Sequence, residues 1–225
     1  YALEGPVHEV RLDAFFLGKH EVTQAQWLRI AHDEPSRYAG PMNFLDPDTG
    51  EVICHVTLLH PVERVTWSEC EYVSRLLGLA LPTEVQWEYA ARAGTSWPWW
   101  TGPNPESLEG AENLQDISSK AIGEPGWPFE KWDDGYPAHA PVNALRPNPW
   151  GLYDMHGYLW EFVADAWHPD YTGAPKDSGA WDGSKKYSSR VIRSGSWRDR
   201  YSSWKSTTRL PPRGHAKSDA IGLRW

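Results

Sequence analysis

The sequence has few cysteines, no long apolar run and no basic run, and these absences narrow the class of protein. Its 225 residues include two cysteines, Cys54 and Cys70, which either pair or remain two free buried thiols. The compartment therefore stays open, with export or the cell surface slightly favoured. No stretch of about 18 apolar residues occurs, so we expect no membrane span. A formal net charge of −8 without a basic run argues against nucleic-acid binding.

Tryptophan, glycine and proline are abundant, with 15 Trp, 19 Gly and 19 Pro. Tryptophan contributes a large buried area with one polar group, and glycine and proline divide a chain into turns. This composition predicts one loop-rich domain over residues 1–225 and excludes a helix bundle. The chain opens without a methionine or an apolar signal core, so we interpret its N-terminus as processed or truncated.

Three short patterns of the form Thr-x-x-Gln/Glu predict where helices begin. They start at Thr23, Thr66 and Thr83, where the hydroxyl can accept a backbone N–H while the later side chain reaches back. Alternation over residues 7–12 predicts a strand, and "PDTG" at 47–50 predicts a turn. Residues 95–190 read mostly as loops, whereas "SSRVIRSGSWRD" and "AIGLRW" predict C-terminal strands.

The stretch "GLYDMHGYLWEF", residues 151–162, sets two carboxylates, Asp154 and Glu161, on either side of Gly157 among apolar side chains. A helix would place positions seven apart on one face, whereas a strand would send them to opposite faces. A turn at Gly157 would instead let backbone carbonyls join both carboxylates around a hard cation. These residues alone leave the three arrangements open.

Five longer motifs occur in a fixed order: "HEVTQAQW", "HPVERVTWSEC", "LPTEVQWEYAARAG", "PNPWGLYDMHGYLWEFVADAW" and "RSGSW…AIGLR". From roughly residue 6 to residue 224, the chain resembles the formylglycine-generating enzyme (sulfatase-modifying factor) family. The resemblance implies an α+β fold of the C-type-lectin-like kind, with two main helices, small antiparallel sheets and much irregular loop. The usual opening strand of the family is missing here.

The resemblance also implies two calcium sites. Calcium accepts six to eight oxygens and tolerates a mixture of carboxylate and carbonyl donors. The first site would use the side chains of Asp154 and Glu161 and the carbonyls of Gly157 and Leu159. The second would use the side chains of Asn113 and Asp134 and the carbonyls of Leu114 and Tyr136.

Simpler interpretations of these calcium positions remain open. Asp154 can cap a turn while Glu161 pairs with an arginine, and Asn113 and Asp134 can be plain turn residues. Tyr158 follows Gly157 where the family usually has asparagine, although that position is not among the implied ligands.

The resemblance implies a catalytic cysteine pair shortly after the "GSW" step, where two thiolates bind copper(I) and activate oxygen. Thiolates suit a soft cuprous ion, and carboxylates or indoles do not. In this chain Asp199 and Trp204 occupy the two positions. We therefore do not expect formylglycine-generating activity. The nine histidines show no H-x-x-x-H spacing, so no paired-histidine motif supports a zinc or iron site either.

The C-terminal segment, residues 198–217, is basic and aromatic within an acidic protein. Arginine and aromatic side chains favour binding surfaces because they offer area, stacking and fork-shaped donors. We expect a protein or small-molecule ligand at a surface made by Arg198, Asp199, Arg200, Tyr201, Trp204, Lys205, Arg209, Arg213 and His215. The plainer interpretation is a solvated loop whose arginines pair with acidic residues.

Two functions follow from these observations. The first is a non-catalytic binding or scaffold module on a calcium-stabilised fold. Variable proteins of diversity-generating retroelements are one subtype of such a module. The second is an enzyme of altered oxidative chemistry, such as the cysteine-less relatives implicated in siderophore maturation.

Overall fold

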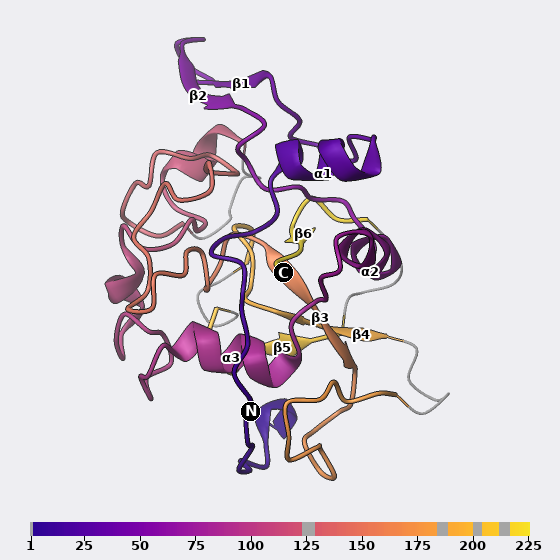
Figure 1. The fold of residues 1–225 in the computed structure, drawn as a ribbon. Coiled ribbons are helices and arrows are strands. Elements are labelled where there is room, and N and C mark those ends of the chain that lie inside the picture. The colour runs from indigo at the N-terminus through magenta and orange to yellow at the C-terminus, as the bar shows by residue number, and fades with distance from the viewer. Residues whose placement is uncertain (1, 123–128, 184–188, 200–203, 212–216) are drawn as a thin grey trace.

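Three α-helices begin where the threonine patterns predict them (Figure 1). The computed structural model describes residues 2–122, 129–183, 189–199, 204–211 and 217–225. Helices α1 (Gln24–Ala31), α2 (Trp67–Leu76) and α3 (Glu84–Arg92) each follow an extended threonine whose side chain accepts the N–H three residues later. The Gln or Glu at that later position accepts the threonine N–H in return, which completes a capping box in all three helices. The fold thus has three short α-helices of similar length.

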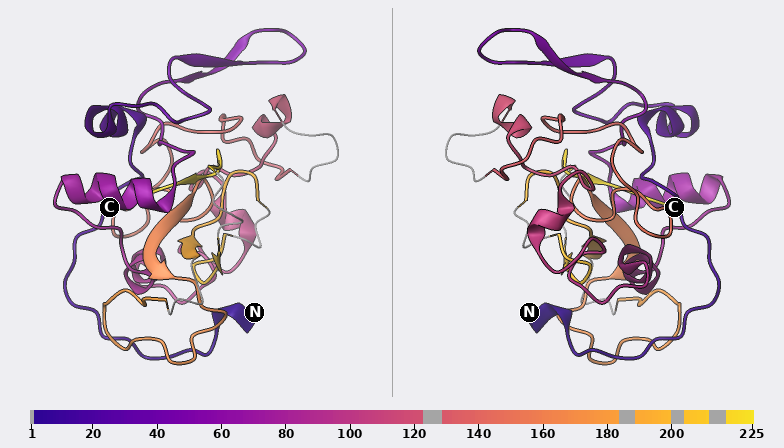
Figure 2. Two further views of the ribbon diagram at one scale, coloured as in Figure 1. Left: turned by 90° about the vertical axis from the view of Figure 1, so that its right-hand side faces the viewer. Right: turned by 90° about the vertical axis from the view of Figure 1, so that its left-hand side faces the viewer.

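Three short 3-10 helices and six strands complete the secondary structure of the described residues. The 3-10 helices are η1 (Ala2–Glu4), η2 (Pro105–Leu108) and η3 (Ser118–Ala121). Strands β1 (Met42–Leu45) and β2 (Val52–Val56) form an antiparallel hairpin around the predicted 47–50 turn, and Figure 2 shows this hairpin projecting from one end of the molecule.

A four-stranded sheet lies at the centre, in the order β5 (Arg209–Leu210), β4 (Arg190–Arg193), β3 (Trp160–Ala166) and β6 (Ile221–Gly222). The β3–β4 and β4–β5 pairs are antiparallel, and β6 runs parallel to β3. Both predicted C-terminal strands are confirmed. The central strand β3 lies within the region that we expected to be mostly loops. Nearly all of its residues are buried, so its sequence lacks the alternation of apolar and polar residues by which a half-buried strand is predicted.

The core consists of helices packed around this sheet. Helices α1 and α2 pack against each other and share one apolar cluster with β3, β4 and β6. Helix α3 packs on β3 and β4 through Trp87, which is fully buried. A third cluster joins the base of the hairpin to Tyr158, Leu159 and Trp197. These contacts hold residues 154–161 in the interior between the sheet and the long loops.

The predicted strand over residues 7–12 is wrong: this part of the chain has no regular secondary structure. Its alternation does not reflect one buried face, because Val7 is 98% exposed. Cys54 and Cys70 are free and buried. Among the described residues, none of the helices has the length and apolarity that a bilayer crossing requires.

Candidate functional site

Residues 151–162 form a turn that leads into strand β3. Asp154 and Tyr158 adopt positive φ angles of 57° and 60°, and Gly157 has φ of 80°. A side chain at Gly157 would also displace the Leu114 side chain, so the positive φ favours glycine there and the close packing adds to that preference. Because β3 begins at Trp160, Asp154 lies on the turn and Glu161 on the strand. The structure therefore has the turn at Gly157 rather than a helix or a continuous strand.

Glu161 pairs with an arginine. Its Oε1 accepts from Arg224 Nη2 at 2.9 Å, and both of its oxygens lie 3.1 Å from Arg224 Nε. Trp87 Nε1 donates to Oε2 at 2.8 Å. The Gly157 carbonyl, also implied as a calcium ligand, accepts from Ser194 Oγ at 2.8 Å. Both carboxylate oxygens of Glu161 are thus engaged, as in the simpler of the two sequence interpretations.

Asp154 has a different environment from Glu161. Its Oδ2 is buried without a hydrogen-bond partner, and so are both carboxylate oxygens of Glu21. Burial raises the pKa of Asp154 and of Glu21 well above the ordinary carboxyl range, and the neighbouring carboxyl groups raise both further. The Asp154 oxygen suits a hard cation, but the engaged Glu161 carboxylate does not. Calcium at the first site, with Leu159 as a carbonyl donor, stays a prediction.

The second implied calcium set is brought together by the loops on either side of η3. Asn113 Nδ2 lies 3.2 Å from Asp134 Oδ2 and 3.5 Å from the Tyr136 carbonyl oxygen. The Leu114 N–H donates to the same Asp134 oxygen at 3.1 Å. Asn113 Oδ1 is buried and has no partner. Four residues that lie up to 23 positions apart therefore meet at one point.

The donor types of this second set, a carboxylate, an amide oxygen and two carbonyls, are those that a hard cation takes. Both Asp134 oxygens also accept backbone N–H groups, from Leu114 at 3.1 Å and from Tyr136 at 2.8 Å. The two ends of an asparagine amide are interchangeable in assignment, and exchanging them would direct Asn113 Oδ1 toward the oxygens of Asp134 and Tyr136. Burial, followed by the charge of Asp116, raises the pKa of Asp134 to about 8. A divalent cation at this point would favour the ionised carboxylate, and oxygen donors of this kind suit calcium.

The two positions that correspond to the family's thiols carry side chains with structural contacts. Asp199 Oδ2 accepts from Trp160 Nε1 at 2.6 Å and from Ser196 Oγ at 2.6 Å. Trp204 is 1% exposed, and its Nε1 donates to the Ser196 carbonyl at 3.0 Å. Trp204 packs in an apolar cluster with Trp99, Leu108, Leu114 and Trp132. This burial differs from the ligand-contacting position that we expected for Trp204.

The rest of the predicted ligand segment divides into buried and exposed parts. Arg209 is buried and binds Glu84 through two nitrogens, at 2.7 Å and 3.0 Å, so it too differs from a surface contact. Arg198 is exposed, and Lys205 is partly buried. Arg200, Tyr201, Arg213 and His215 lie outside the described residues.

One surface cavity near this segment contains side chains that the sequence did not bring together. Its volume is about 480 Å³, and it is lined by Arg37, Arg64, Arg198, Lys217, Ser218 and Asp219. We call its four cationic residues the basic cluster. Arg37 follows α1 and Arg64 precedes α2, so no local motif could have linked them to residues 198–217.

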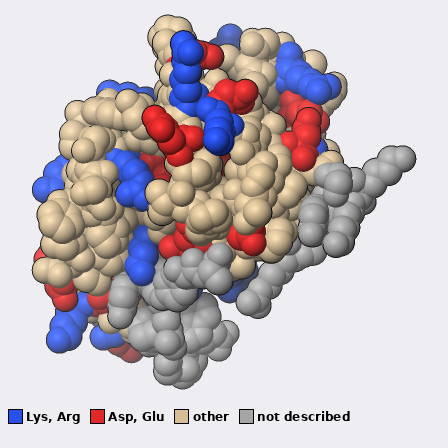
Figure 3. All heavy atoms as spheres, turned by 90° about the horizontal axis from the view of Figure 1, so that it is seen from below, with Lys and Arg blue, Asp and Glu red and all other residues tan. Residues whose placement is uncertain are grey.

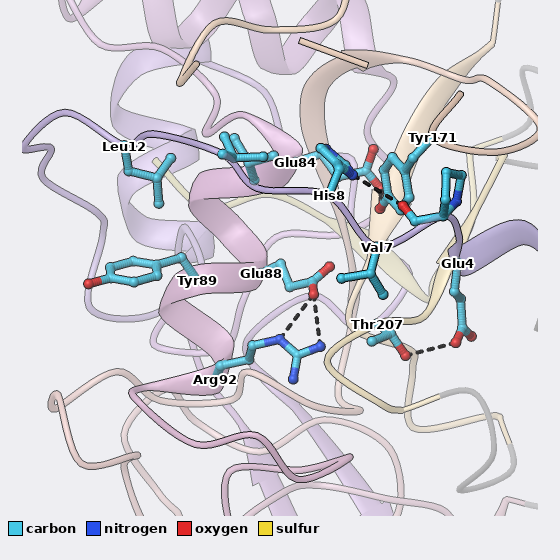
Figure 4. A pocket seen from close by; sticks show the side chains of 13 residues that line it. Glu4, Val7, His8, Leu12, Glu84, Glu88, Tyr89, Arg92, Tyr171 and Thr207 are labelled. Carbon is cyan, nitrogen blue, oxygen red and sulfur yellow. Dashed lines mark hydrogen bonds and ion pairs between the residues drawn. The ribbon is translucent and has the colours of Figure 1, made fainter. Parts of the chain in front are cut away.

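A second cavity, of about 280 Å³, lies between the N-terminal segment and α3 (Figure 4). Its carboxylates already have partners: Glu88 accepts from Arg92, and Glu4 accepts from Thr207 at 2.9 Å. Glu84, at its inner wall, is bound by Arg193 and Arg209. This cavity could therefore enclose a ligand, but few of its charged side chains are left to bind one. Figure 3 shows that basic and acidic side chains are likewise interspersed over the described part of the face seen from below.

Residues 2–225 match the family model described as "Sulfatase-modifying factor enzyme 1-like domain". The chain is 33% identical over 143 residues to a formylglycine-generating enzyme of Thermomonospora curvata, which covers 61% of this chain and 45% of that protein. It is 30% identical over 173 residues to the inactive C-alpha-formylglycine-generating enzyme 2 of Bos taurus. This match covers 73% of this chain and 49% of that protein. The chain spans about half the length of the curated relatives that it matches.

Two solved structures share the fold. Treponema denticola variable protein 1 has a TM-score of 0.70 at 22% identity, covering 96% of this chain and 84% of that one. PvdO from Pseudomonas aeruginosa has a TM-score of 0.69 at 25% identity, and the match covers 100% of this chain and 84% of that one. The α+β architecture expected from the motifs is therefore confirmed.

Proposed function

Because the chain belongs to the sulfatase-modifying factor enzyme 1-like domain family, we propose that it is a non-catalytic module that presents residues 198–217 to a protein or small-molecule ligand. The observation that carries this proposal is the identity of the side chains at positions 199 and 204, which correspond to the family's two catalytic cysteines. A carboxylate and a buried indole stand there, and neither suits a cuprous ion. Both side chains have interior partners, so they have a structural role that does not depend on catalysis.

The comparison with an inactive relative supports this proposal. A protein named as an inactive formylglycine-generating enzyme is 30% identical to this chain, which shows that the family includes members without that activity. A narrower form of the proposal is that residues 198–217 vary among copies, as in variable proteins of diversity-generating retroelements. Sequencing related loci beside a reverse-transcriptase gene would test it, and invariant copies would contradict it.

Calcium belongs to the proposal as a structural ion. Asn113 and Asp134 would hold it with their side chains, and the carbonyls of Leu114 and Tyr136 would complete the protein's share of the ligands. A bound divalent ion would neutralise Asp134 and tie together loop segments that carry little regular secondary structure. The module would then keep its shape without needing a larger apolar core.

A peptide assay tests the non-catalytic part. The purified chain is incubated with a cysteine-containing sulfatase-motif peptide, copper(I), a thiol reductant and oxygen, with the Thermomonospora curvata enzyme as positive control. We expect no conversion of cysteine to formylglycine by mass spectrometry, and conversion would contradict the proposal. Oxygen consumption without formylglycine would instead support the alternative, an enzyme of altered oxidative chemistry.

An array experiment tests the binding part. Phosphorylated, sulfated, glycosylated and unmodified peptides and small molecules are immobilised and probed with the labelled chain. An Arg198→Ala/Lys205→Ala variant removes two cations of the segment, and Arg75→Ala removes an exposed arginine of α2 as control. We expect ligands that the double variant loses and the control retains. Ligands that both variants bind equally would contradict recognition through residues 198–217.

A further inference from the structure

We propose that the basic cluster is a binding site for a phosphate dianion, either free or as a monoester on a small molecule. Arg37, Arg64, Arg198 and Lys217 line one cavity of about 480 Å³. The inference rests on the proposed function, since Arg198 and Lys217 belong to the 198–217 segment, and it names the chemical class of the ligand.

Four separate parts of the chain supply these cations. Arg37 follows α1, Arg64 precedes α2, Arg198 follows β4, and Lys217 precedes β6. The side chains of Arg37, Arg198 and Lys217 are 60%, 38% and 38% exposed. They are therefore accessible from solvent while their backbones are held by the fold. A convergence of this kind in a cavity differs from a run of basic residues on one solvated helix.

Asp219 orients two of the guanidinium groups. It is 6% exposed, and its two oxygens bind Arg37 Nη1 at 2.9 Å and Arg198 Nη1 at 2.6 Å. Its carbonyl oxygen is fixed from the interior by His139 Nε2 at 3.0 Å. A guanidinium has five N–H donors, so the contact to Asp219 leaves other donors of Arg37 to face the cavity. Side chains that are oriented in advance lose less entropy when a ligand binds.

Arg64 contributes a charge that no carboxylate balances directly. Within the part of the chain that the structure describes, its guanidinium forms no ion pair, because the nearby carboxylates of Asp219 and Glu69 bind the other three cations of the basic cluster instead. Its backbone has a φ of 59°, which is uncommon for a residue other than glycine, and its N–H donates to the Ser218 carbonyl at 3.0 Å. This contact ties Arg64 to the strand-end segment that carries Lys217. Unusual backbone conformations of this kind concentrate at functional positions.

The charge balance favours a dianion over a singly charged ligand. Asp219 contacts two of the arginines, and Glu69 binds Lys217 at 2.6 Å, so four cations meet two carboxylates. Glu63, which precedes Arg64 in the chain, is buried, and burial raises its pKa to about 7, so at neutral pH it adds only part of a charge. Counting only the residues that the structure describes, an excess of roughly two positive charges therefore remains, in a protein whose formal net charge is −8. Guanidinium forks match the geometry of phosphate oxygens, which directs the inference to phosphate.

Calorimetric titration tests the site. Inorganic phosphate, phenyl phosphate and benzoate are titrated separately into the wild-type chain in a phosphate-free buffer of low ionic strength, because salt weakens exposed electrostatic contacts. We expect both phosphates to bind at least tenfold more tightly than benzoate. Phenyl phosphate binding tenfold tighter than inorganic phosphate would identify a monoester as the ligand, and equal affinities would identify the free ion. Benzoate binding as tightly as phosphate would overturn the proposal.

Matched variants locate the binding. Arg64→Asn removes the uncompensated charge and places a residue that tolerates positive φ at this position. We expect at least tenfold weaker phosphate binding in Arg64→Asn and unchanged binding in Arg75→Gln, an exposed arginine of α2 that pairs with Glu71. Equal affinity in Arg64→Asn and wild type would overturn the site. If array ligands still required Arg198 and Lys205 in that case, the proposed binding function would stand without the phosphate assignment.

Discussion

Two clusters of buried charged side chains differ in how their charges are balanced. The first, which we call the Glu84 cluster, contains Glu84, Glu88, Tyr171, Arg193 and Arg209. The second, the Glu161 cluster, contains Glu21, Glu112, Asp154, Glu161 and Arg224. Apart from Glu88, which is 26% exposed, both lie in the interior, and each has an arginine bound to a buried glutamate.

The Glu84 cluster has at least one arginine for each carboxylate, since Arg92 also binds Glu88. Arg193 donates to Glu84 and Glu88 at 2.8 Å each, and Arg209 donates to both oxygens of Glu84. Tyr171 donates its hydroxyl to Glu84 at 3.0 Å. Because the protein itself supplies the opposite charges, this cluster needs no additional ion.

The Glu161 cluster has more carboxyl groups than cations. Arg224 binds Glu161 closely and lies 3.6 Å from Glu21. Unpartnered oxygens remain on Glu21, Glu112 and Asp154. A buried carboxylate without a partner is costly, so these groups must hold protons or be neutralised by a cation. Burial of charge alone therefore does not identify a functional site. The Glu161 cluster, which has more carboxyl groups than cations, can take up a proton or a cation, whereas the Glu84 cluster needs neither.

The largest expected effect comes from breaking the balanced cluster. Glu84→Gln leaves Arg193 and Arg209 with too few carboxylates, and removing one partner of a buried ion pair typically costs about 3–5 kcal/mol. We expect a loss of this size in the free energy of unfolding, measured by urea denaturation. Arg75→Gln breaks only a surface pair and serves as control, with an expected loss below about 1 kcal/mol. Equal losses in the two variants would show that the Glu84 cluster does not stabilise the fold.

The pH dependence of the same variant sharpens this result. Burial alone would raise the pKa of Glu84, but the charge of Arg193 and the contacts with Arg209 outweigh it, so the pKa in the folded state lies below the ordinary 4.5. A group with a lowered folded-state pKa stabilises the fold above its unfolded-state pKa and loses that contribution as pH falls. The difference in unfolding free energy between wild type and Glu84→Gln should therefore be complete above about pH 5 and shrink at lower pH. A difference that grows on acidification would contradict this account.

Calcium removal is the next test in size. A ligand that binds only the folded state stabilises it by about 2.7 kcal/mol when its free concentration is about 100 times its dissociation constant. We expect a chelator to lower the melting temperature and Asp134→Asn to abolish most of that shift. Asp154→Asn examines the first implied site separately. A melting temperature that chelator does not change, with no calcium in elemental analysis, would exclude calcium at both sites.

The sequence predicted the helix starts because each depends on groups only three residues apart, as Thr23, Thr66 and Thr83 show. It could not predict that Arg209 is buried, since Glu84 lies 125 positions away. The indole of Trp204 is also placed by distant partners, and its position next to basic residues suggested a surface instead. The calcium residues came from a resemblance to a family, and spacing alone would not have joined Asn113 to Asp134.

The smallest expected effect concerns Glu21, and it separates the two clusters most directly. Burial raises the pKa of Glu21 well above its ordinary 4.5, so folding at neutral pH must either protonate this carboxyl or bury a charge. Glu21→Gln keeps a similar shape and removes that cost. In the presence of chelator at pH 7, we expect the free energy of unfolding to stay the same or to rise by about 1 kcal/mol, in contrast to the loss for Glu84→Gln. A loss as large as that of Glu84→Gln would mean that Arg224 holds Glu21 as a charged partner, and the excess of carboxyl groups would then lie in Glu112 and Asp154 alone.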